Sequence, residues 1–390
     1  MSGDTFYLMR RDIPVMCFDA PNYRISGIKE IFEPDILPVG AGRDGLHFAD
    51  WLSFRMIPAS RIAFLRNLPG TGVLDSSELV FLNHGLSLLN QYWIKHEDED
   101  LLWSEINLFE NDFSEEVGLA LVNRLKLTAD DIKLRYGVSP EGLSPGDQPK
   151  RWSIDKDGNR ILIKTDRSGE LAVNELLASM LAQKIGLPHT DYKLGKDNDQ
   201  MASFGKCFTS SNTEIVHALD LFNEYGFPDT SYKTEDYYNY TAKLFSDMGV
   251  QGVQEYLDKM LCIDYVMCQE DRHYNNFGLL HNIDTDTWSM APLYDSGDAC
   301  YANVAAKFID LNADVIGKPF GPSGRVNLND QMRNVKTGVY ISDDIIESIL
   351  PEYKNLLDEI GMSEDKQKLL IESLHLRTLR MMECIGINSK

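Results

Sequence analysis

The stretch from Asp271 to Asp295, DRHYNNFGLLHNIDTDTWSMAPLYD, constrains the fold more than any other part of the chain. Two short apolar runs, FGLLHN and TWSMAPLY, are separated by IDTDT, which predicts a β-hairpin. The hairpin follows a buried helical pattern that we expect to end near Glu270. Folding the hairpin back would carry Asp295 toward Asp271 and Asn276.

Carboxylate and amide oxygens that converge in this way predict a magnesium site. Mg²⁺ prefers such hard ligands, keeps several waters and also binds substrate phosphates. A nearby carboxylate can accept a hydroxyl proton. The alternative is that Asp and Asn only form turns here, because both favour loop conformations. That alternative weakens for the whole set, because the chain also supplies Lys164 on an earlier predicted strand and a glycine-containing loop.

The spacing of these residues is typical of protein kinases. Kinases use an Asp and an Asn five positions apart, another Asp on Mg²⁺ after a hairpin, and a strand lysine on the phosphates. Asp271 and Asn276 have this separation, and Asp295 follows the predicted hairpin. Lys164 ends an ILIK strand that is comparable to the kinase VAIK motif.

A Pro- and Gly-rich stretch from Tyr136 to Trp152 marks the clearest boundary. Residues 1–135 are predicted to form one α+β unit. Residues 136–208 are predicted to form a small lobe, with strands in KRWSIDKDGNRILIK and MASFGKCFTS and a helix in GELAVNELLASMLAQKIG. Residues 209–390 are predicted to form a larger helical lobe, because long apolar stripes at helical spacing dominate there.

At these motifs the chain resembles the HipA-like serine/threonine kinases. DRHYNNFGLL followed by APLYD resembles the family's catalytic loop and metal-binding motif, and SPGDQPK resembles its phosphate loop. ILIK and AVNELLASMLAQKIG resemble the nucleotide lysine strand and the following helix. The resemblance covers roughly residues 140–390, and GLSLLNQYWI and NLFENDFSEEVG resemble the leading segment of Gram-positive-type members. It implies an α+β, protein-kinase-like two-lobed fold with an N-terminal α+β region.

The resemblance also implies a role for each matching residue. Asp271 would be the catalytic base, Asn276 and Asp295 the Mg²⁺ ligands, and Lys164 the contact to the phosphates of ATP. The remaining ATP-binding residues would form three groups. The phosphate loop would supply Gly146, Asp147, Gln148 and Lys150, and the adenine hinge would supply Lys206 and Phe208. His273 would contact phosphate or hold the base.

Two departures from the family pattern stand out. Ser144 lies one position out of register with the family's regulatory serine, which puts its autophosphorylation in doubt. The carboxylate partner of Lys164 is Glu175 or Glu170, and the sequence leaves both open.

The function implied is an ATP- and Mg²⁺-dependent kinase that acts on Ser or Thr hydroxyls of a protein substrate. For such a kinase the resemblance implies a toxin or growth-regulating role, often countered by a small DNA-binding antitoxin. Two alternatives are a catalytically weak nucleotide-binding module that acts through a partner, and a metal-dependent phosphohydrolase. The phosphohydrolase would leave Lys164 and the strand-rich lobe unexplained.

Composition excludes some partners and favours one compartment. A net charge of −22 and a pI near 4.7 argue against a direct nucleic-acid or anionic-membrane surface. We see no targeting segment and no run near the roughly 20 apolar residues that a membrane helix needs. The 6 cysteines are scattered without a CxxC pair, so we expect reduced thiols in a cytoplasmic protein.

Overall fold

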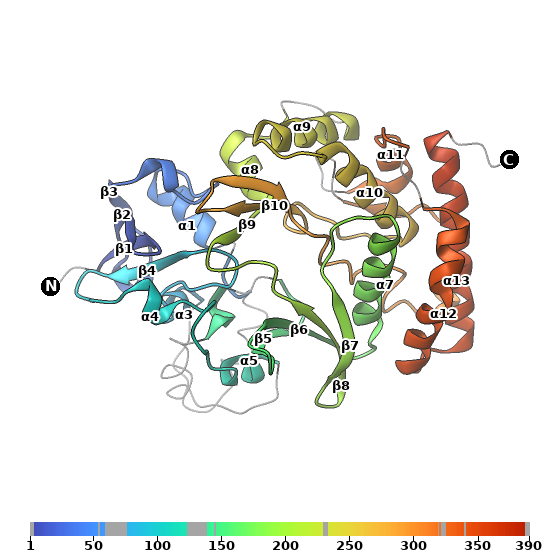
Figure 1. Cartoon of the computed structure of the whole chain (residues 1–390), viewed down its shortest axis with the longest axis horizontal. Coiled ribbons are helices and arrows are strands. Elements are labelled where there is room, and N and C mark those ends of the chain that lie inside the picture. The colour runs from blue at the N-terminus through green and yellow to red at the C-terminus, as the bar shows by residue number, and fades with distance from the viewer. Residues whose placement is uncertain are drawn as a thin grey trace.

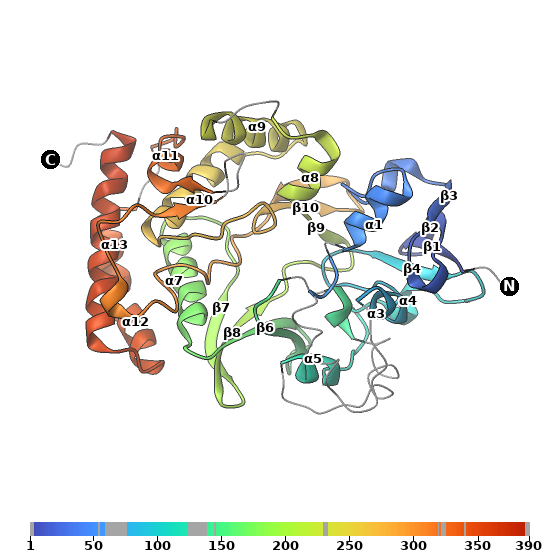
Figure 2. The ribbon, with the colours of Figure 1, turned by 180° about the vertical axis from the view of Figure 1, so that it is seen from behind.

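The computed structural model describes residues 4–53, 55–58, 76–122, 139–143, 146–228, 233–318, 320, 325–338 and 341–386. A β-sheet of the N-terminal region lies at one end of the molecule, and two long C-terminal helices lie at the other (Figures 1 and 2). The strand-rich lobe and the rest of the helical lobe lie between these ends. The predicted two-lobed α+β architecture is therefore confirmed.

The N-terminal region is built on an antiparallel sheet of order β3-β2-β1-β4. Its strands are β1 (Thr5–Arg10), β2 (Ile13–Asp19), β3 (Gly27–Ile31) and β4 (Tyr92–His96). Its helices are α1 (Gly45–Ser53), α3 (Ser76–Leu82), α4 (Trp103–Ile106) and α5 (Glu116–Leu121). Phe18, Phe48 and Trp51 are buried in the core between the sheet and α1. The end of the helix predicted in FSEEVGLALVNRLKL lies outside the described residues.

The strand-rich lobe is an antiparallel sheet of order β5-β6-β8-β7 with one helix packed against it. Its elements are β5 (Lys150–Ile154), β6 (Arg160–Asp166), α7 (Glu170–Lys184), β7 (Tyr192–Asp197) and β8 (Gln200–Lys206). The predicted turn between β5 and β6 forms around Gly158, which has a φ of +80°. β7 was not predicted, because YKLGKD is largely polar and contains a glycine.

The helical lobe surrounds one central buried helix, α10 (Val253–Val266). Its other helices are α8 (Ala218–Tyr225), α9 (Thr234–Asp247), α11 (Leu328–Met332), α12 (Asp343–Glu359) and α13 (Glu364–Ile385). Strands β12 (Ile316–Gly317) and β13 (Val326–Asn327) form a short pair. The central helix ends at Val266, earlier than the end near Glu270 that the sequence predicted. The chain turns earlier because Cys268 adopts a φ of +52° and the Gln269 N–H donates to the Asp264 carbonyl.

The predicted hairpin forms as β10 (Gly278–Asn282) and β11 (Thr287–Met290). The strand β9 (Thr213–His217), which was not predicted, pairs with β10 and completes a sheet of order β11-β10-β9. A side chain at Gly278 would collide with the backbone of Val216 in β9, so this pairing requires glycine.

The N-terminal region is docked on this sheet. Arg10 Nη2 lies 2.9 Å from Glu214 Oε1, and Arg11 Nη1 lies 2.7 Å from Asp284 Oδ1. The Ile215 N–H donates to the Leu89 carbonyl at 2.9 Å. β4 and β9 accordingly lie close together in both views (Figures 1 and 2).

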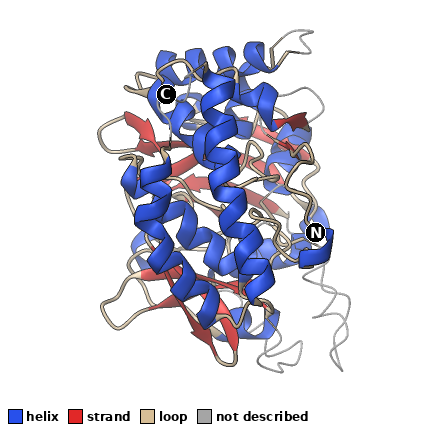
Figure 3. Ribbon diagram, turned by 90° about the vertical axis from the view of Figure 1, so that its right-hand side faces the viewer, coloured by secondary structure: helices blue, strands red, loops and turns tan. Residues whose placement is uncertain are grey.

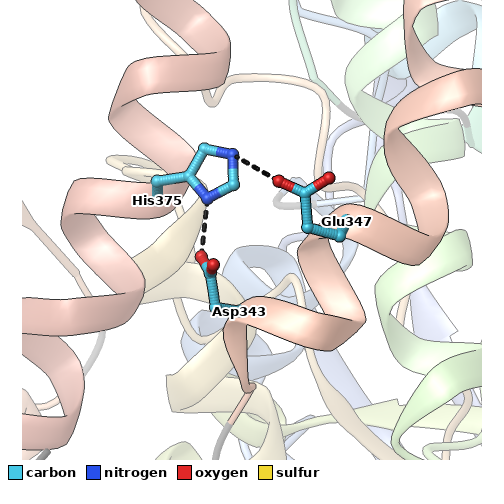
Figure 4. Close-up of side chains that lie close together, drawn as sticks. All are labelled: Asp343, Glu347 and His375. Atoms are coloured by element: carbon cyan, nitrogen blue, oxygen red, sulfur yellow. Dashed lines mark hydrogen bonds and ion pairs between the residues drawn. The ribbon is translucent and has the colours of Figure 1, made fainter.

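At the opposite end, α12 and α13 run side by side (Figure 3). His375 of α13 joins them on the surface, with Nδ1 2.6 Å from Asp343 Oδ1 and Nε2 3.5 Å from Glu347 Oε1 (Figure 4). Each ring nitrogen faces a different carboxylate, so the arrangement is an ion-pair cluster between helices. Such exposed pairs contribute little to stability. Across the part of the chain that is described, no helix has the length and apolar character needed to span a bilayer.

Candidate active site

Two adjoining cavities contain every residue that the sequence predicted for the site. The strand-side cavity, of about 360 Å³, is lined by Lys164, Lys206 and Phe208. The loop-side cavity, of about 950 Å³, is lined by Asp147, Gln148 and Asp271. The walls of both cavities include Gly146, Lys150, His273, Asn276 and Asp295. Residues from three separate parts of the sequence therefore meet at one place.

Lys164 connects the two lobes. Its Nζ lies 2.7 Å from Glu175 Oε1 on α7 and 2.5 Å from Asp295 Oδ1 after the hairpin. Glu170 instead pairs with Lys366, at 2.7 Å, which decides between the two carboxylates that the sequence left open. Burial disfavours the charge on Lys164, but Asp295 and Glu175 outweigh it and hold the lysine pKa well above its usual value. Lys164 therefore carries a positive charge at neutral pH.

Asp295 is the acidic centre of this arrangement. Burial raises its pKa, but the nearby positive charges of Lys164 and Lys150 more than compensate, so the pKa lies well below its usual range. Burial raises the pKa of Asp298, and the charges of Asp271 and Asp295 raise it further. Carboxylates that repel one another at a cavity wall are a suitable environment for a divalent cation.

The loop from Asp271 to Asn276 is closed by its own hydrogen bonds. The Asp271 carbonyl accepts from the His273 N–H at 2.8 Å and from Asn276 Nδ2 at 2.9 Å. The Asn276 N–H donates to the His273 carbonyl at 2.8 Å. The donor end of the Asn276 amide is therefore engaged, and its acceptor end, Oδ1, is the end that suits a cation. The oxygens of Asn276 and Asp295 thus fit a hard ion such as Mg²⁺.

Arg272 fixes this loop to the segment that follows the hairpin. Its guanidinium is fully buried and bonds both oxygens of Asp264 on α10, the nearest at 3.0 Å. It also donates to the Asn276 carbonyl at 3.1 Å, the Tyr294 carbonyl at 2.6 Å and Ser296 Oγ at 2.7 Å. This residue was not predicted from the sequence. The signal was the charged Asp264 inside the apolar pattern of a buried helix.

Lys318 contacts the side chain of Asp271, with Nζ 2.5 Å from Oδ1. His273 Nε2 lies 3.8 Å from the other oxygen, Oδ2. Burial lowers the pKa of His273, although Asp271 partly opposes this shift. Lys318 was also not predicted from the sequence, because it lies 47 residues after Asp271 and no local pattern connects it to the loop.

The end of the strand-side cavity beside Lys206 is aromatic and apolar. The Phe208 ring lies 5.4 Å from the Tyr294 ring, and Leu162 and Ile215 line the same cavity. Walls of this kind suit a flat heteroaromatic ring. Ser144 lies outside the described residues, so its register is not placed by this geometry.

A strand lysine paired with a helix glutamate, together with a loop and a hairpin that bring Asp271, Asn276 and Asp295 to one cavity, defines a protein-kinase-like fold. Residues 138–349 match the family described as the HipA-like C-terminal domain. The chain belongs to this family.

Solved structures that resemble the chain include those of a HipA protein and of the kinase CtkA. HipA of Shewanella oneidensis MR-1, solved in a complex with HipB and its operator DNA, has a TM-score of 0.52 at 13% identity. The match covers 98% of this chain and 97% of that chain, and it supports the fold. The Helicobacter pylori proinflammatory kinase CtkA has a TM-score of 0.45 at 19% identity, with 61% of this chain and 94% of that chain covered. A search of curated proteins gave no match.

Proposed function

We propose that this protein is an ATP- and Mg²⁺-dependent kinase that transfers the γ-phosphoryl group to a Ser or Thr hydroxyl of a protein. The observation that carries this proposal is the position of Lys164 between Glu175 and Asp295, on a cavity that also includes Asn276. A hydrolase would not require this lysine bridge between two lobes. The adjoining aromatic wall supports a nucleotide rather than a simple phosphate as ligand.

Each residue has a distinct part in this proposal. Asn276 and Asp295 would hold Mg²⁺, which neutralises charge on the phosphates when bound. Lys164 contacts the phosphates and Lys150, at the end of the phosphate loop, covers them. Asp271 accepts the proton of the substrate hydroxyl, because it lies on the loop-side cavity and stands apart from Lys164. Catalysis would come mostly from positioning and charge neutralisation.

We further propose that residues 136–208 and 209–390 form the two catalytic lobes and that residues 1–135 form the accessory N-terminal region. The relative from Shewanella was solved with HipB and operator DNA as a toxin–antitoxin system. By analogy, a small DNA-binding antitoxin is the partner we propose for this chain. The acidic charge of −22 supports contact with DNA through such a partner rather than directly.

Incubation of the purified protein with γ-labelled ATP and Mg²⁺ tests the function. We expect label on protein with wild type and none with Asp271→Ala. Release of free phosphate without protein labelling would instead support a phosphohydrolase. Nucleotide binding with neither product would support the binding module.

A further inference from the structure

The N-terminal region supplies part of the wall of the strand-side cavity. Trp51 belongs to α1, Arg55 to the turn after it, and Leu89 to the loop before β4. These residues line the cavity together with His217, Asp220 and Asn223 of the helical lobe. Leu89 falls in GLSLLNQYWI, the other five residues lie outside the motifs of the sequence analysis, and the roles proposed above use none of the six.

Arg55 is held in this corner by two contacts. Its Nη2 lies 3.2 Å from Asp220 Oδ2, and its guanidinium carbon lies 4.2 Å from the centroid of the Trp51 ring. The side chains of Arg55 and Asp220 are only 12% and 15% exposed. A guanidinium that is stacked on an aromatic ring and paired with a carboxylate is pre-organised. Arg55 is therefore a fixed part of the cavity wall.

The loop before α1 reinforces this corner. The Gly40 N–H donates to Glu224 Oε2 at 3.0 Å, and a Cβ at Gly40 would lie 2.9 Å from the Asp220 carbonyl oxygen. Gly40 has a φ of +80°, which a residue with a side chain rarely adopts. The N-terminal region thus packs directly on the first turns of α8, where Asp220 is found.

The corner lies toward the aromatic end of the cavity. His217 Nδ1 is 3.4 Å from Asp220 Oδ2, and the His217 ring is 6.5 Å from the Tyr294 ring. Tyr294 in turn packs against Phe208. The cations proposed to bind the phosphates lie by Asp295 instead. Lys164 is paired with Asp295, and the charge of Lys150 also acts on it. The Arg55–Asp220 pair is therefore placed to contact the nucleoside half of a bound nucleotide.

We propose that the N-terminal region completes the nucleotide site, with Trp51 and the Arg55–Asp220 pair in contact with the nucleoside part of ATP. The inference rests on the proposed function. It gives residues 1–135 a direct part in nucleotide affinity, because both Trp51 and Arg55 belong to that region.

The test compares a whole nucleotide with its phosphates alone. Dissociation constants are measured with Mg²⁺ for a non-hydrolysable ATP analogue and, by displacement of a fluorescent ATP analogue, for inorganic tripolyphosphate. For Arg55→Ala we expect about tenfold weaker binding of the ATP analogue, as expected for loss of a contact to a charged group. Binding of tripolyphosphate should stay within about twofold of wild type, because its contacts lie at Lys164 and Lys150.

Arg11→Ala is the matched control. Arg11 also joins the N-terminal region to the rest of the chain, through Asp284 and the Ser211 carbonyl, but it does not line the cavity. The Arg11→Ala variant should bind the ATP analogue and tripolyphosphate with affinities within about twofold of wild type. If Arg55→Ala fails to fold, Arg55→Lys keeps the positive charge but not the planar stacking, and we expect about threefold weaker binding of the ATP analogue.

Three results would overturn the inference. The first is an unchanged affinity of Arg55→Ala for the ATP analogue. The second is an equal loss of affinity by Arg55→Ala for the analogue and for tripolyphosphate. The third is a loss of affinity for the analogue in Arg11→Ala as large as that in Arg55→Ala. A wild-type protein that binds tripolyphosphate but not the ATP analogue would contradict the inference and the kinase proposal together. A wild type that binds the analogue but transfers no phosphoryl group would contradict the kinase proposal alone.

Discussion

Lys164 carries a charge where an unpaired charge would be very unfavourable. Its side chain is 4% exposed, and that of Glu175 is 1% exposed. Glu175 also accepts a hydrogen bond from the Ser296 N–H at 2.8 Å. A buried ion pair contributes less to stability than its geometry suggests. Removing one partner nevertheless leaves the other as an unpaired buried charge, which is strongly destabilising. This pair is best explained by function, since a methionine and a glutamine would fill the same space without charge.

We expect Lys164→Met to abolish phosphoryl transfer and to lower the free energy of unfolding by about 3 kcal/mol, because Glu175 is left buried and unpaired. The double variant Lys164→Met with Glu175→Gln should recover most of this stability and none of the activity. Denaturant unfolding and the labelled-ATP assay measure the two effects. Normal transfer by the single variant Lys164→Met would show that Lys164 is not part of the site.

The contact between Lys318 and Asp271 leads to a second prediction. Lys318→Met should reduce transfer on the order of tenfold, because the lysine holds the side chain of the proposed base. Affinity for Mg²⁺-ATP should be nearly unchanged. Lys243→Met, on an exposed face of α9, is the control and should leave both transfer and affinity unchanged. Equal losses of binding and turnover in Lys318→Met would mean that Lys318 acts on the nucleotide rather than on Asp271.

Residue types at the site were predictable, but several partners were not. Asp271, Asn276 and Asp295 could be found because they lie in one short stretch around a hairpin. Glu170 and Glu175 could not be separated, because both are carboxylates on one helix and the choice depends on how α7 packs on the sheet. Lys318 could not be found at all, since its contact is made only in three dimensions.

At the scale of elements, the hairpin β10–β11 and the end of α10 determine the distance between the loop and Asp295. Arg272 is the shared connection, since it bonds Asp264 on α10, the Asn276 carbonyl and the Tyr294 carbonyl. One guanidinium can satisfy several acceptors in a fixed plane, whereas an ammonium cannot reproduce this geometry. If this connection is lost, we therefore expect both the loop from Asp271 to Asn276 and the segment that follows the hairpin to shift.

Arg272→Lys should lower the free energy of unfolding by about 2 kcal/mol and weaken Mg²⁺-ATP binding, because several buried acceptors lose their donor. Arg380→Lys on α13 is a matched control, since Arg380 also bonds a carbonyl, that of Leu311, but lies away from the cavities. Calorimetric titration with Mg²⁺-ATP provides the affinity. Normal affinity in folded Arg272→Lys would show that the loop holds its shape without this arginine.

Elements with strong patterns were predicted well, and edge elements were missed. The apolar stripes of α7, α10, α12 and α13 identified these helices, although the end of α10 depended on a turn at Cys268 that no periodicity reveals. Strands β7 and β9 were missed, because the burial of each depends on its partner strand rather than on its own alternation.

In the whole molecule, the N-terminal region is a docked component rather than a separate appendage. It contacts the helical lobe through Arg10, Arg11 and Arg55, each of which forms an ion pair with an acidic side chain of that lobe. Burial raises the pKa of Asp220, but the charge of Arg55 and the contact with His217 outweigh it, so the pKa lies below its usual value. This pair therefore stabilises the docked arrangement at neutral pH.

Asp220→Asn should lower the free energy of unfolding by about 1–3 kcal/mol at pH 7. A carboxyl whose pKa is lower in the folded state stabilises the protein above its unfolded pKa, near 4, and loses this contribution as the pH falls through the folded value. The difference from wild type should thus be present at pH 5 and shrink below about pH 4. Urea unfolding across this range provides the measurement. A difference that grows on acidification would contradict the assigned direction.

The docking of the N-terminal region could not be predicted from the sequence. The pair Arg10–Glu214 spans 204 residues, and Arg55–Asp220 spans 165. Contacts of such long range leave no periodicity or spacing signal in the chain. The sequence therefore predicted two lobes and a preceding α+β region, while the part of that region in the cavity became visible only in the structure.

The central claim is that Asp271 accepts the hydroxyl proton while Asn276 and Asp295 hold the metal. Asp271→Asn tests it most directly, with Mg²⁺-ATP affinity measured by calorimetry and transfer to protein measured with labelled ATP on the same preparation. We expect near-normal affinity and loss of transfer, because in the proposed mechanism Asp271 is needed for the chemical step and not for binding. Loss of ATP binding as complete as in Asp295→Ala, or retention of near-normal transfer, would contradict it.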